Sequence, residues 1–335
     1  MAALDFKDWK IAGTIVSILL LVLAFWNVDF AKLLSVTAGA ALLPIAAVAA
    51  INFVVVALKA YRWKVVLAAT KNVGFPTVLL TTLVGFMANN VLPARAGELV
   101  RIIVLGKKAG ISKTTVLGTL ALDRVFEGVG MLVVLAALPF LIETPDWMRK
   151  GTLVFVILMT AVLAVLIVMV RLESGRWVTW IPVSDRWSSF LQTMAAKLKD
   201  GLRTINNARA TAIVLLVSAA VWFLQGLMVH LCLESIGLHF GLTHALFILM
   251  VINLAIMAPA APGNIGTFEF SAMLALGYLG VDPTPALSFA LIYHFVQMIP
   301  LTLVGIIALP ALGIRLADIR RGDGDVERGD RRDSE

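Results

Sequence analysis

Residues 89–101 read NNVLPARAGELVR, and the path of the chain through the membrane depends on how they are interpreted. Its first residue ends a run of fifteen uncharged residues, 75–89 (FPTVLLTTLVGFMAN), whose composition suits the interior of a membrane. Pro93 and Gly97 interrupt helical structure here, and Arg95, Glu98 and Arg101 add charge. A helix that simply crossed the membrane would not need so many polar groups at its end, so the stretch calls for a different path of the chain.

The composition indicates a polytopic helical membrane protein. Of the 335 residues, 60% are hydrophobic and only 15% are charged. The apolar runs are continuous, which disfavours a β-barrel. The net charge of +7 comes from Lys and Arg that cluster between apolar runs, as in cytoplasmic loops. There is no separate basic domain, so we expect no nucleic-acid partner, and the single Cys232 gives no disulfide framework.

The apolar runs cannot all cross the membrane. A span needs about 20 residues, and the candidate runs are 11–28, 37–58, 75–92, 114–142, 152–170, 210–233, 243–258, 265–280 and 286–312. If 75–92 spanned fully, the basic residues on its two sides would lie on opposite faces, which the positive-inside rule disfavours. The conflict disappears if 75–110 forms a re-entrant hairpin that enters from the cytoplasm, turns near Pro93 and returns.

A second re-entrant hairpin is predicted over 243–280, where two runs of about 16 residues flank the turn PAAPGNIG. No Lys or Arg occurs between Arg209 and Arg315, so this hairpin would enter from outside. The sequence therefore predicts an all-α polytopic membrane protein with about six transmembrane helices plus two re-entrant helical hairpins. Both termini would be cytoplasmic.

The two halves of this topology, about 10–142 and 152–312, each hold three spans and one hairpin. An odd number of spans gives the halves opposite orientations, the inverted repeat of many transporters. The hairpin turns agree loosely in spacing: Pro93, Gly97 and Glu98 in the first, and Pro262, Gly266 and Glu269 in the second. We expect one transmembrane domain over 1–315 and a disordered cytoplasmic tail over 316–335. Residues 184–209 fit either an interfacial helix or an ordinary amphipathic connector.

Ionisable groups at membrane depth are candidates for function, because each charge costs about 2.5–3.5 kcal/mol to insert. These are Arg95, Glu98, Arg101, Asp123, Arg124, Glu127, Glu269 and His294. Asp123 and Glu127 lie four residues apart on one helix face, and Arg124 reaches Glu127 three residues on. They would lock the first hairpin against the next helix, serve in coupling of transport, or do both. His294 joins these candidates, with a structural role as the alternative.

The hairpin turns predict an anion site. Pro93, Gly97, Pro262, Gly263 and Gly266 break the helices, so the arm after each turn would aim its positive dipole end into the protein. Arg95 and Arg101 would add charge suited to a phosphate. Asn89 and Asn90 would bind a head group or satisfy freed backbone groups, and we favour the backbone role for one of them. Glu98 and Glu269 would cap a helix, pair with arginine or carry a coupling proton.

Motifs of other chemistries are not found in the sequence. The four histidines are scattered without metal-ligand spacing, and there is no phosphate-binding loop or dinucleotide fingerprint. No serine stands in a nucleophile elbow. We expect no metal, no cofactor and no enzymatic activity.

The motifs NNVLPARAGELVR, LALDRVFEG and PGNIGTFE, with Arg62-Trp63 before the first, resemble the transmembrane domain of the lysylphosphatidylglycerol synthase family. The resemblance covers about 10–312 and implies a stand-alone flippase-like protein that moves a lipid or lipid-linked head group between leaflets. The matching positions are Asn90, Pro93, Arg95, Gly97, Glu98 and Arg101 in the first motif, and Pro262, Gly263, Gly266 and Glu269 in the second. Asp123 stands where Glu is usual, Asn264 replaces a common Gly, and His294 stands where Arg is expected.

The leading hypothesis is a flippase for a lipid with an anionic head group, located in a bacterial inner membrane. Asn89, Asn90, Arg95, Arg101 and Arg62 would bind the substrate. One alternative is a non-transporting partner of a lipid- or glycan-modifying enzyme. Another is a lipid pyrophosphate phosphatase, but PGNIGTFE offers neither the serine nor the arginine that such chemistry wants. A membrane lipid is the expected partner, and a homodimer and a lipid-modifying enzyme stay open.

Overall fold

The protein is all-helical over the part of the chain that its structure, a computed structural model, describes: residues 6–92, 96–171, 207–257 and 261–313. Pro93, Arg95, the predicted tail 316–335 and most of the predicted amphipathic segment 184–209 lie outside this part. The α-helices are α1 Phe6–Ala24, α2 Phe30–Ala38, α3 Leu42–Ala68, α4 Phe75–Val91, α5 Gly97–Ala109, α6 Lys113–Leu141, α7 Asp146–Arg171, α9 Ala208–Ser235, α10 Leu242–Ala255, α11 Thr267–Tyr278 and α12 Pro283–Ala311; a short 3-10 turn, η3, covers Pro262–Asn264.

Several helices have the length and composition of membrane spans. Counted over the described residues, α3, α6, α9 and α12 are long and apolar enough to cross a membrane. The shorter apolar helices α4 and α10 lie among them, and α1 and α7 have 19 and 26 residues. The protein is thus a polytopic membrane protein, as predicted from its composition.

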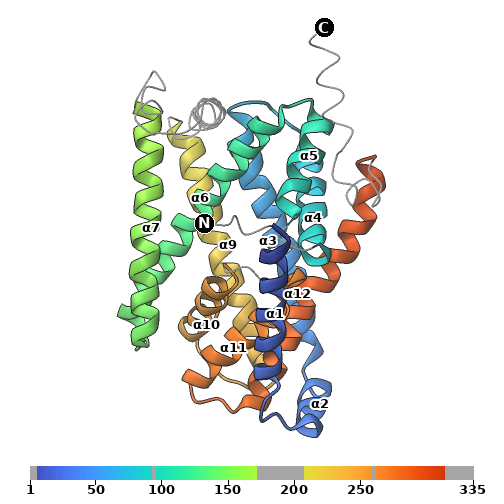
Figure 1. Cartoon of the computed structure of the whole chain (residues 1–335), viewed down its shortest axis with the longest axis vertical. Coiled ribbons are helices and arrows are strands. Elements are labelled where there is room, and N and C mark those ends of the chain that lie inside the picture. Colours follow the sequence, from blue (N-terminus) through green and yellow to red (C-terminus); the bar gives the residue numbers. More distant parts are fainter. Residues whose placement is uncertain (1–5, 93–95, 172–206, 258–260, 314–335) are drawn as a thin grey trace.

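The long helices form the centre of the bundle. α3 packs most extensively against α9, and α12 against α4 (Figure 1). The largest buried cluster joins apolar residues of α9, α10, α11 and α12, whereas large hydrophobic side chains on the outer faces of α1, α3 and α12 are exposed. This inside-out surface is expected where lipid, rather than water, surrounds the helices.

Two helical hairpins lie toward opposite ends of the long axis (Figure 1). The first hairpin consists of α4 and α5, which pack side by side, and the second consists of α10, η3 and α11. The arms of the first hairpin are 17 and 13 residues long, and those of the second are 14 and 12, all shorter than a usual span.

The end of α4 and the turn η3 meet beside α12. Asn90, near the end of α4, donates a hydrogen bond to Thr302 Oγ1 at 2.9 Å and another to the Met298 carbonyl at 3.3 Å. A β-carbon on Gly263 in η3 would lie 3.5 Å from the Asn90 carbonyl oxygen. The tip of each hairpin therefore contacts the other as well as α12.

Pro300 lies inside α12 and cannot donate a backbone hydrogen bond to Val296. Beside this gap, the buried Asn52 of α3 donates to the Gln297 carbonyl at 3.1 Å. The bond gives the buried amide of Asn52 a partner one residue beyond Val296, whose carbonyl Pro300 leaves without its helical donor. α3 and α12 are thereby fixed to each other near the middle of the bundle.

Three predicted runs have wrong bounds, and one of them, 152–170, belongs to a helix that already begins at Asp146. The run predicted over 37–58 is a longer helix, α3, which continues to Ala68 through Lys59 and Arg62 because both charges are paired inside the bundle. The helix predicted over 11–28 ends at Ala24, and a separate short helix, α2, follows. Asp29 ends the connection between them by accepting a hydrogen bond from the Lys32 amide at the start of α2.

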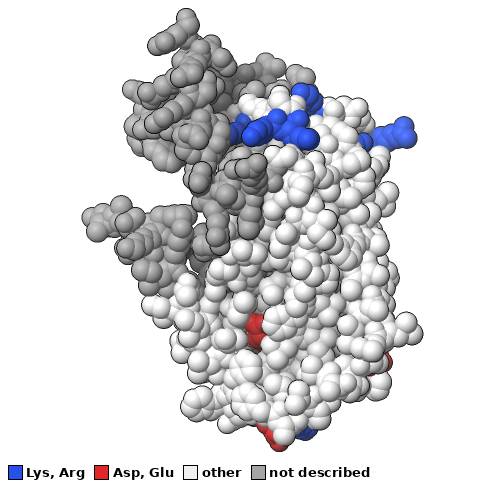
Figure 2. All heavy atoms as spheres, turned by 90° about the vertical axis from the view of Figure 1, so that its right-hand side faces the viewer, with Lys and Arg blue, Asp and Glu red and all other residues white. Residues whose placement is uncertain are grey.

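Charge on the surface is concentrated near one end of the molecule. In Figure 2 most of the blue on the visible face lies near the upper end, and the long body below it is nearly uncharged. Exposed lysines lie just before the first hairpin, in the last turn of α5 and at the start of α6: Lys71, Lys107, Lys108 and Lys113. Lys71 donates to the Ala109 carbonyl, so the end of α5 is tied to the α3–α4 connection.

Candidate functional site

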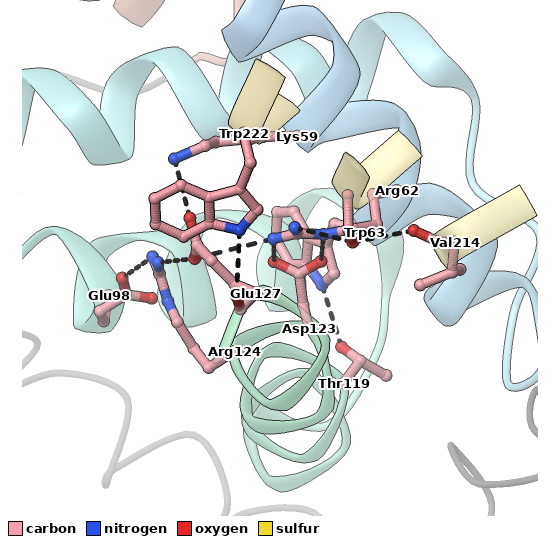
Figure 3. Close-up of polar contacts among 11 residues, drawn as sticks. Lys59, Arg62, Trp63, Glu98, Thr119, Asp123, Arg124, Glu127, Val214 and Trp222 are labelled. Atoms are coloured by element: carbon pink, nitrogen blue, oxygen red, sulfur yellow. Dashed lines mark hydrogen bonds and ion pairs between the residues drawn. The ribbon is translucent and has the colours of Figure 1, made fainter. Parts of the chain in front are cut away.

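A buried ion pair joins α3 to α6. Arg62 is fully buried, and its guanidinium binds both oxygens of Asp123, through Nε at 2.7 Å and Nη2 at 3.1 Å (Figure 3). Its Nη1 donates to Ser218 Oγ on α9 at 3.3 Å. Such a two-pronged contact is the geometry that arginine offers and lysine does not. Arg62, predicted to bind substrate, makes three hydrogen bonds within the protein.

Glu127, one turn further along α6, lies within 4 Å of three cationic side chains. Lys59 Nζ lies 2.8 Å from its Oε1, Arg124 contacts its Oε2, and Arg62 Nη2 lies 3.7 Å from the same Oε2 (Figure 3). The indole of Trp222 on α9 donates to the Glu127 backbone carbonyl at 3.3 Å. The predicted contact between Arg124 and Glu127 at a spacing of three residues is present.

Glu98 connects this cluster to the first hairpin. Its carboxylate, in the first turn of α5, pairs with Arg124 of α6 (Figure 3). Both side chains are partly exposed, at 34% and 44%. The ion network consists of Lys59, Arg62, Glu98, Asp123, Arg124 and Glu127. Its three cations and three anions balance, and it holds α3, α5 and α6 together.

Arg101 is a further positive charge that is not part of the ion network. Its side chain on α5 is 4% exposed, and its Nε and Nη2 have no hydrogen-bond partner among the described residues. The guanidinium lies over the Phe86 ring at 4.8 Å and crosses the backbone of Gly85, where no β-carbon obstructs it. It is close enough to the ion network to interact with its charges, but the nearest carboxylate in sequence, Glu98, is paired with Arg124.

The two asparagines of the opening motif bind the protein itself. Asn89 Oδ1 accepts a hydrogen bond from the Gly97 amide at 2.8 Å and so satisfies a free N–H at the start of α5. Asn90 fixes α4 to α12, as described above. The structure thus gives both amides a role in holding the first turn, whereas only one such role was expected. Their predicted contact with a substrate stays a prediction.

In the second hairpin, Glu269 and His294 form a buried pair. His294 Nδ1 of α12 lies 2.6 Å from Glu269 Oε1 of α11, and its Nε2 lies 2.8 Å from the Gly263 carbonyl oxygen. Glu269 Oε2 accepts from the Gly266 amide at 2.7 Å, the helix-capping role that was one expectation for it. The His294 ring stacks on the Phe268 ring, with the two ring centroids 4.2 Å apart.

The second turn depends on its glycines and on α1. Gly263 and Gly266 have positive φ angles of 66° and 88°, which glycine adopts without strain. A β-carbon on Gly266 would overlap the Ser17 carbonyl, and Ser17 Oγ accepts from the Ala261 amide at 2.8 Å. Pro262 starts η3. Among the predicted turn residues, these three lie as expected at the break between two helical arms.

Several residues of the site were not found from the sequence. Lys59 looks like an ordinary residue at the edge of an apolar run and Trp222 like one in the middle of another, and only the fold brings them to Glu127. Gly85 gave a usable signal, because glycine inside an apolar helix often marks a close approach of another segment. Within the described residues, no group of three or more His, Cys, Asp or Glu is placed to hold a metal ion.

Comparison with known proteins supplies a family. The sequence profile described as the Lysylphosphatidylglycerol synthase TM region matches residues 10–305. A UPF0104 membrane protein of Methanocaldococcus jannaschii is 22% identical over 226 residues, 65% of this chain and 91% of the relative. One of Methanothermobacter thermautotrophicus is 23% identical, covering 80% of this chain and 85% of the relative.

A third relative belongs to a longer protein. Glycosyltransferase AglD of Haloferax volcanii is 25% identical over 344 residues. The match covers 91% of this chain but 55% of that protein. The membrane region shared with this chain is therefore one part of a larger polypeptide in that relative.

Proposed function

Because this chain belongs to the Lysylphosphatidylglycerol synthase TM region family, we propose that it moves a lipid or lipid-linked molecule with an anionic head group between the leaflets of its membrane. The observation that carries the proposal is Arg101, a buried guanidinium without a partner among the described residues beside a network whose own charges balance. Leaving a buried charge unpaired is costly. An anionic ligand would supply the missing counter-charge, and a phosphate matches the fork of arginine.

The proposal includes a topology. The 12- to 17-residue arms would form two re-entrant hairpins, and α1, α3, α6, α7, α9 and α12 would be six spans arranged as an inverted repeat. Turns that approach from opposite ends and meet at α12 support this arrangement (Figure 1). The lysine-rich end would face the cytoplasm, and both termini would lie on that side. The membrane would be a bacterial inner membrane.

The test is a leaflet assay in proteoliposomes that contain the purified protein. A fluorescent phosphatidylglycerol is placed in the bilayer, and its exposure to an external quencher is followed against a phosphatidylcholine of the same acyl chains. Wild-type protein is expected to move the anionic lipid faster than the zwitterionic one. Equal rates, or no movement of either lipid, would contradict the proposal.

Arg101→Gln and Lys108→Gln make a matched pair for this assay. Both remove one positive charge from α5, but Lys108 is exposed at its far end. Arg101→Gln is expected to slow movement of the anionic lipid about tenfold or more, since a hydrogen bond to a charged group is worth about 1.5–3 kcal/mol. Lys108→Gln should leave it unchanged. If the two variants behave alike, Arg101 is not the binding group.

A second candidate function is favoured by one comparison. In the protein named glycosyltransferase AglD, the matched region, which covers 91% of this chain, is one part of a longer polypeptide. We propose as the second candidate that this chain is a membrane partner of a lipid- or glycan-modifying enzyme that is encoded separately. On that proposal the protein copurifies with such an enzyme and raises its activity, but moves no lipid alone. Native mass spectrometry of the purified protein distinguishes the two, because it reports bound lipid, bound enzyme and any homodimer.

A further inference from the structure

The His294 ring lies between two hydrogen-bond acceptors. Its two nitrogens face a carboxylate oxygen of Glu269 at 2.6 Å and a backbone carbonyl oxygen of Gly263 at 2.8 Å. A neutral imidazole has one N–H and can donate to only one of them. The geometry therefore needs two protons, one on Nε2 toward Gly263 and one between Nδ1 and Glu269 Oε1.

The second of these protons decides whether the contact is attractive. With it, Glu269 and His294 are neutral as a pair, either as an ion pair or as two neutral groups. Without it, a carboxylate and an imidazole lone pair face each other at 2.6 Å, and the pair carries one uncompensated negative charge in a buried site. Breaking a buried pair in this way is strongly destabilising.

Other ionisable side chains lie on the described elements packed against α12, but none is hydrogen-bonded to Glu269 or His294: Lys32 of α2, Tyr61 and Lys64 of α3, and Arg209, His230 and Glu234 of α9. α4 contains no ionisable side chain, and Lys59 and Arg62 of α3 are paired with Glu127 and Asp123. The buried Cys232 of α9 and Tyr293 of α12 are uncharged at neutral pH. The charge of this region is therefore set by Glu269 and His294 themselves.

We propose that Glu269 and His294 form a proton-binding site that holds the second turn against α12, and that loss of this proton releases the turn. One proton passes from the pair to water, and no covalent bond changes. The turn is attached to α12 through Gly263 and to the start of α11 through Gly266, so both ends of residues 263–266 move with the pair. That this release drives lipid movement rests on the proposed function; the proton site does not.

The chain offers a matched control in Glu234 and His239. Their Nδ1–Oε2 distance is 2.8 Å, close to that of the buried pair, but the His239 side chain is 76% exposed. Water can solvate either protonation state of such a pair, so its titration should move nothing else. The two pairs differ in burial and in the second acceptor, which are the features that the proposal depends on.

The first measurement is nitrogen NMR of protein labelled at its four histidines, reconstituted in lipid; the His294 signal is the one missing from His294→Gln. We expect a ring with two bound protons, or a ring hydrogen-bonded to a protonated carboxyl, which infrared spectroscopy of Glu269 separates. A neutral His294 beside an ionised Glu269 while the turn stays closed would overturn the proposal.

The second measurement is hydrogen exchange over 261–270, corrected for the intrinsic effect of pH. If one proton controls the turn, exchange should rise by up to about tenfold per pH unit over the titration range. In Glu269→Gln the amide can donate to Nδ1 and still accept from Gly266, so the turn should stay closed at every pH. Glu269→Ala should open it at every pH, and Glu234→Gln should behave as wild type.

The transport assay separates the two proposals. If Glu269→Gln keeps a closed turn but loses the response of lipid movement to a pH gradient, both stand. If the turn opens with pH in a protein that moves no lipid, the proposed function fails and the proton site stands. If lipid moves but Glu269→Gln and wild type share one pH profile in exchange, the proton site is wrong.

Discussion

The side chain of Arg101 runs across the bare α-carbon of Gly85: a β-carbon at position 85 would lie 2.6 Å from Arg101 Cγ and 2.9 Å from Cδ. Because α4 and α5 are the two arms of one hairpin, the glycine in the first arm sets the path of the charge in the second. Gly85 thereby positions Arg101 over Phe86 and beside the ion network.

Gly85→Ala is therefore expected to displace Arg101. The added methyl group overlaps the stem of the side chain, and overpacking of this kind costs about 1–3 kcal/mol. Lipid movement should fall as in Arg101→Gln, and the double variant should be no worse than either single one. Gly277→Ala, where a β-carbon meets nothing within 4 Å, is the control and should lose neither stability nor transport.

Asp123→Ala should destabilise the protein strongly, because it leaves the fully buried Arg62 without its carboxylate. Removing one partner of a buried pair costs about 3–5 kcal/mol, which thermal unfolding in detergent, followed by tryptophan fluorescence, would register as a lower midpoint. Asp123→Glu keeps the charge and should be milder. Glu234→Ala, in the exposed pair, should change the free energy of unfolding by about 1 kcal/mol or less. An equal loss of stability in the two alanine variants would contradict the stabilising role of the Arg62–Asp123 pair.

Gly97→Ala is expected to force the arms of the first hairpin apart. A β-carbon there would overlap the Gly85 carbonyl oxygen, and backbone cannot move aside as a flexible side chain can. The hydrogen bond from the Gly97 amide to Asn89 should be lost with it. Hydrogen exchange at the start of α5 should become faster than in Gly151→Ala, whose β-carbon meets nothing within 4 Å; equal exchange rates would argue against a close approach.

Glu98→Gln should loosen the first hairpin without unfolding the protein. The pair with Arg124 is partly exposed, and such pairs contribute about 0–1 kcal/mol. We expect a nearly unchanged unfolding midpoint but faster hydrogen exchange at the start of α5, where Glu98 pairs with Arg124 of α6. Lys107→Gln, in the last turn of the same helix, should leave that exchange as it is; a large fall in midpoint for Glu98→Gln would mean that the network is more tightly coupled than its exposure indicates.

The helical class, the separation of α4 from α5 and the break at Pro262–Gly266 follow from sequence, because long apolar runs and helix-breaking residues act locally. The continuation of α3 past Leu58 does not. Lys59 and Arg62 look like the charged end of a span until Asp123 and Glu127, some sixty residues later, arrive beside them. The contact between Arg124 and Glu127 was predictable because helix geometry alone sets it, whereas its partner Glu98 comes from another helix.

Asn90 and the second turn attach to α12 one helical turn apart, at Met298 and His294. The end of α4 and the second turn, which lie far apart in the sequence, are thus fixed to one helix. A shift of α12 along its axis carries both tips in the same direction, which advances one toward its end of the molecule and withdraws the other. Within the proposed function, such a shift would open the site toward one side while closing it toward the other, because both tips are fixed to the same helix.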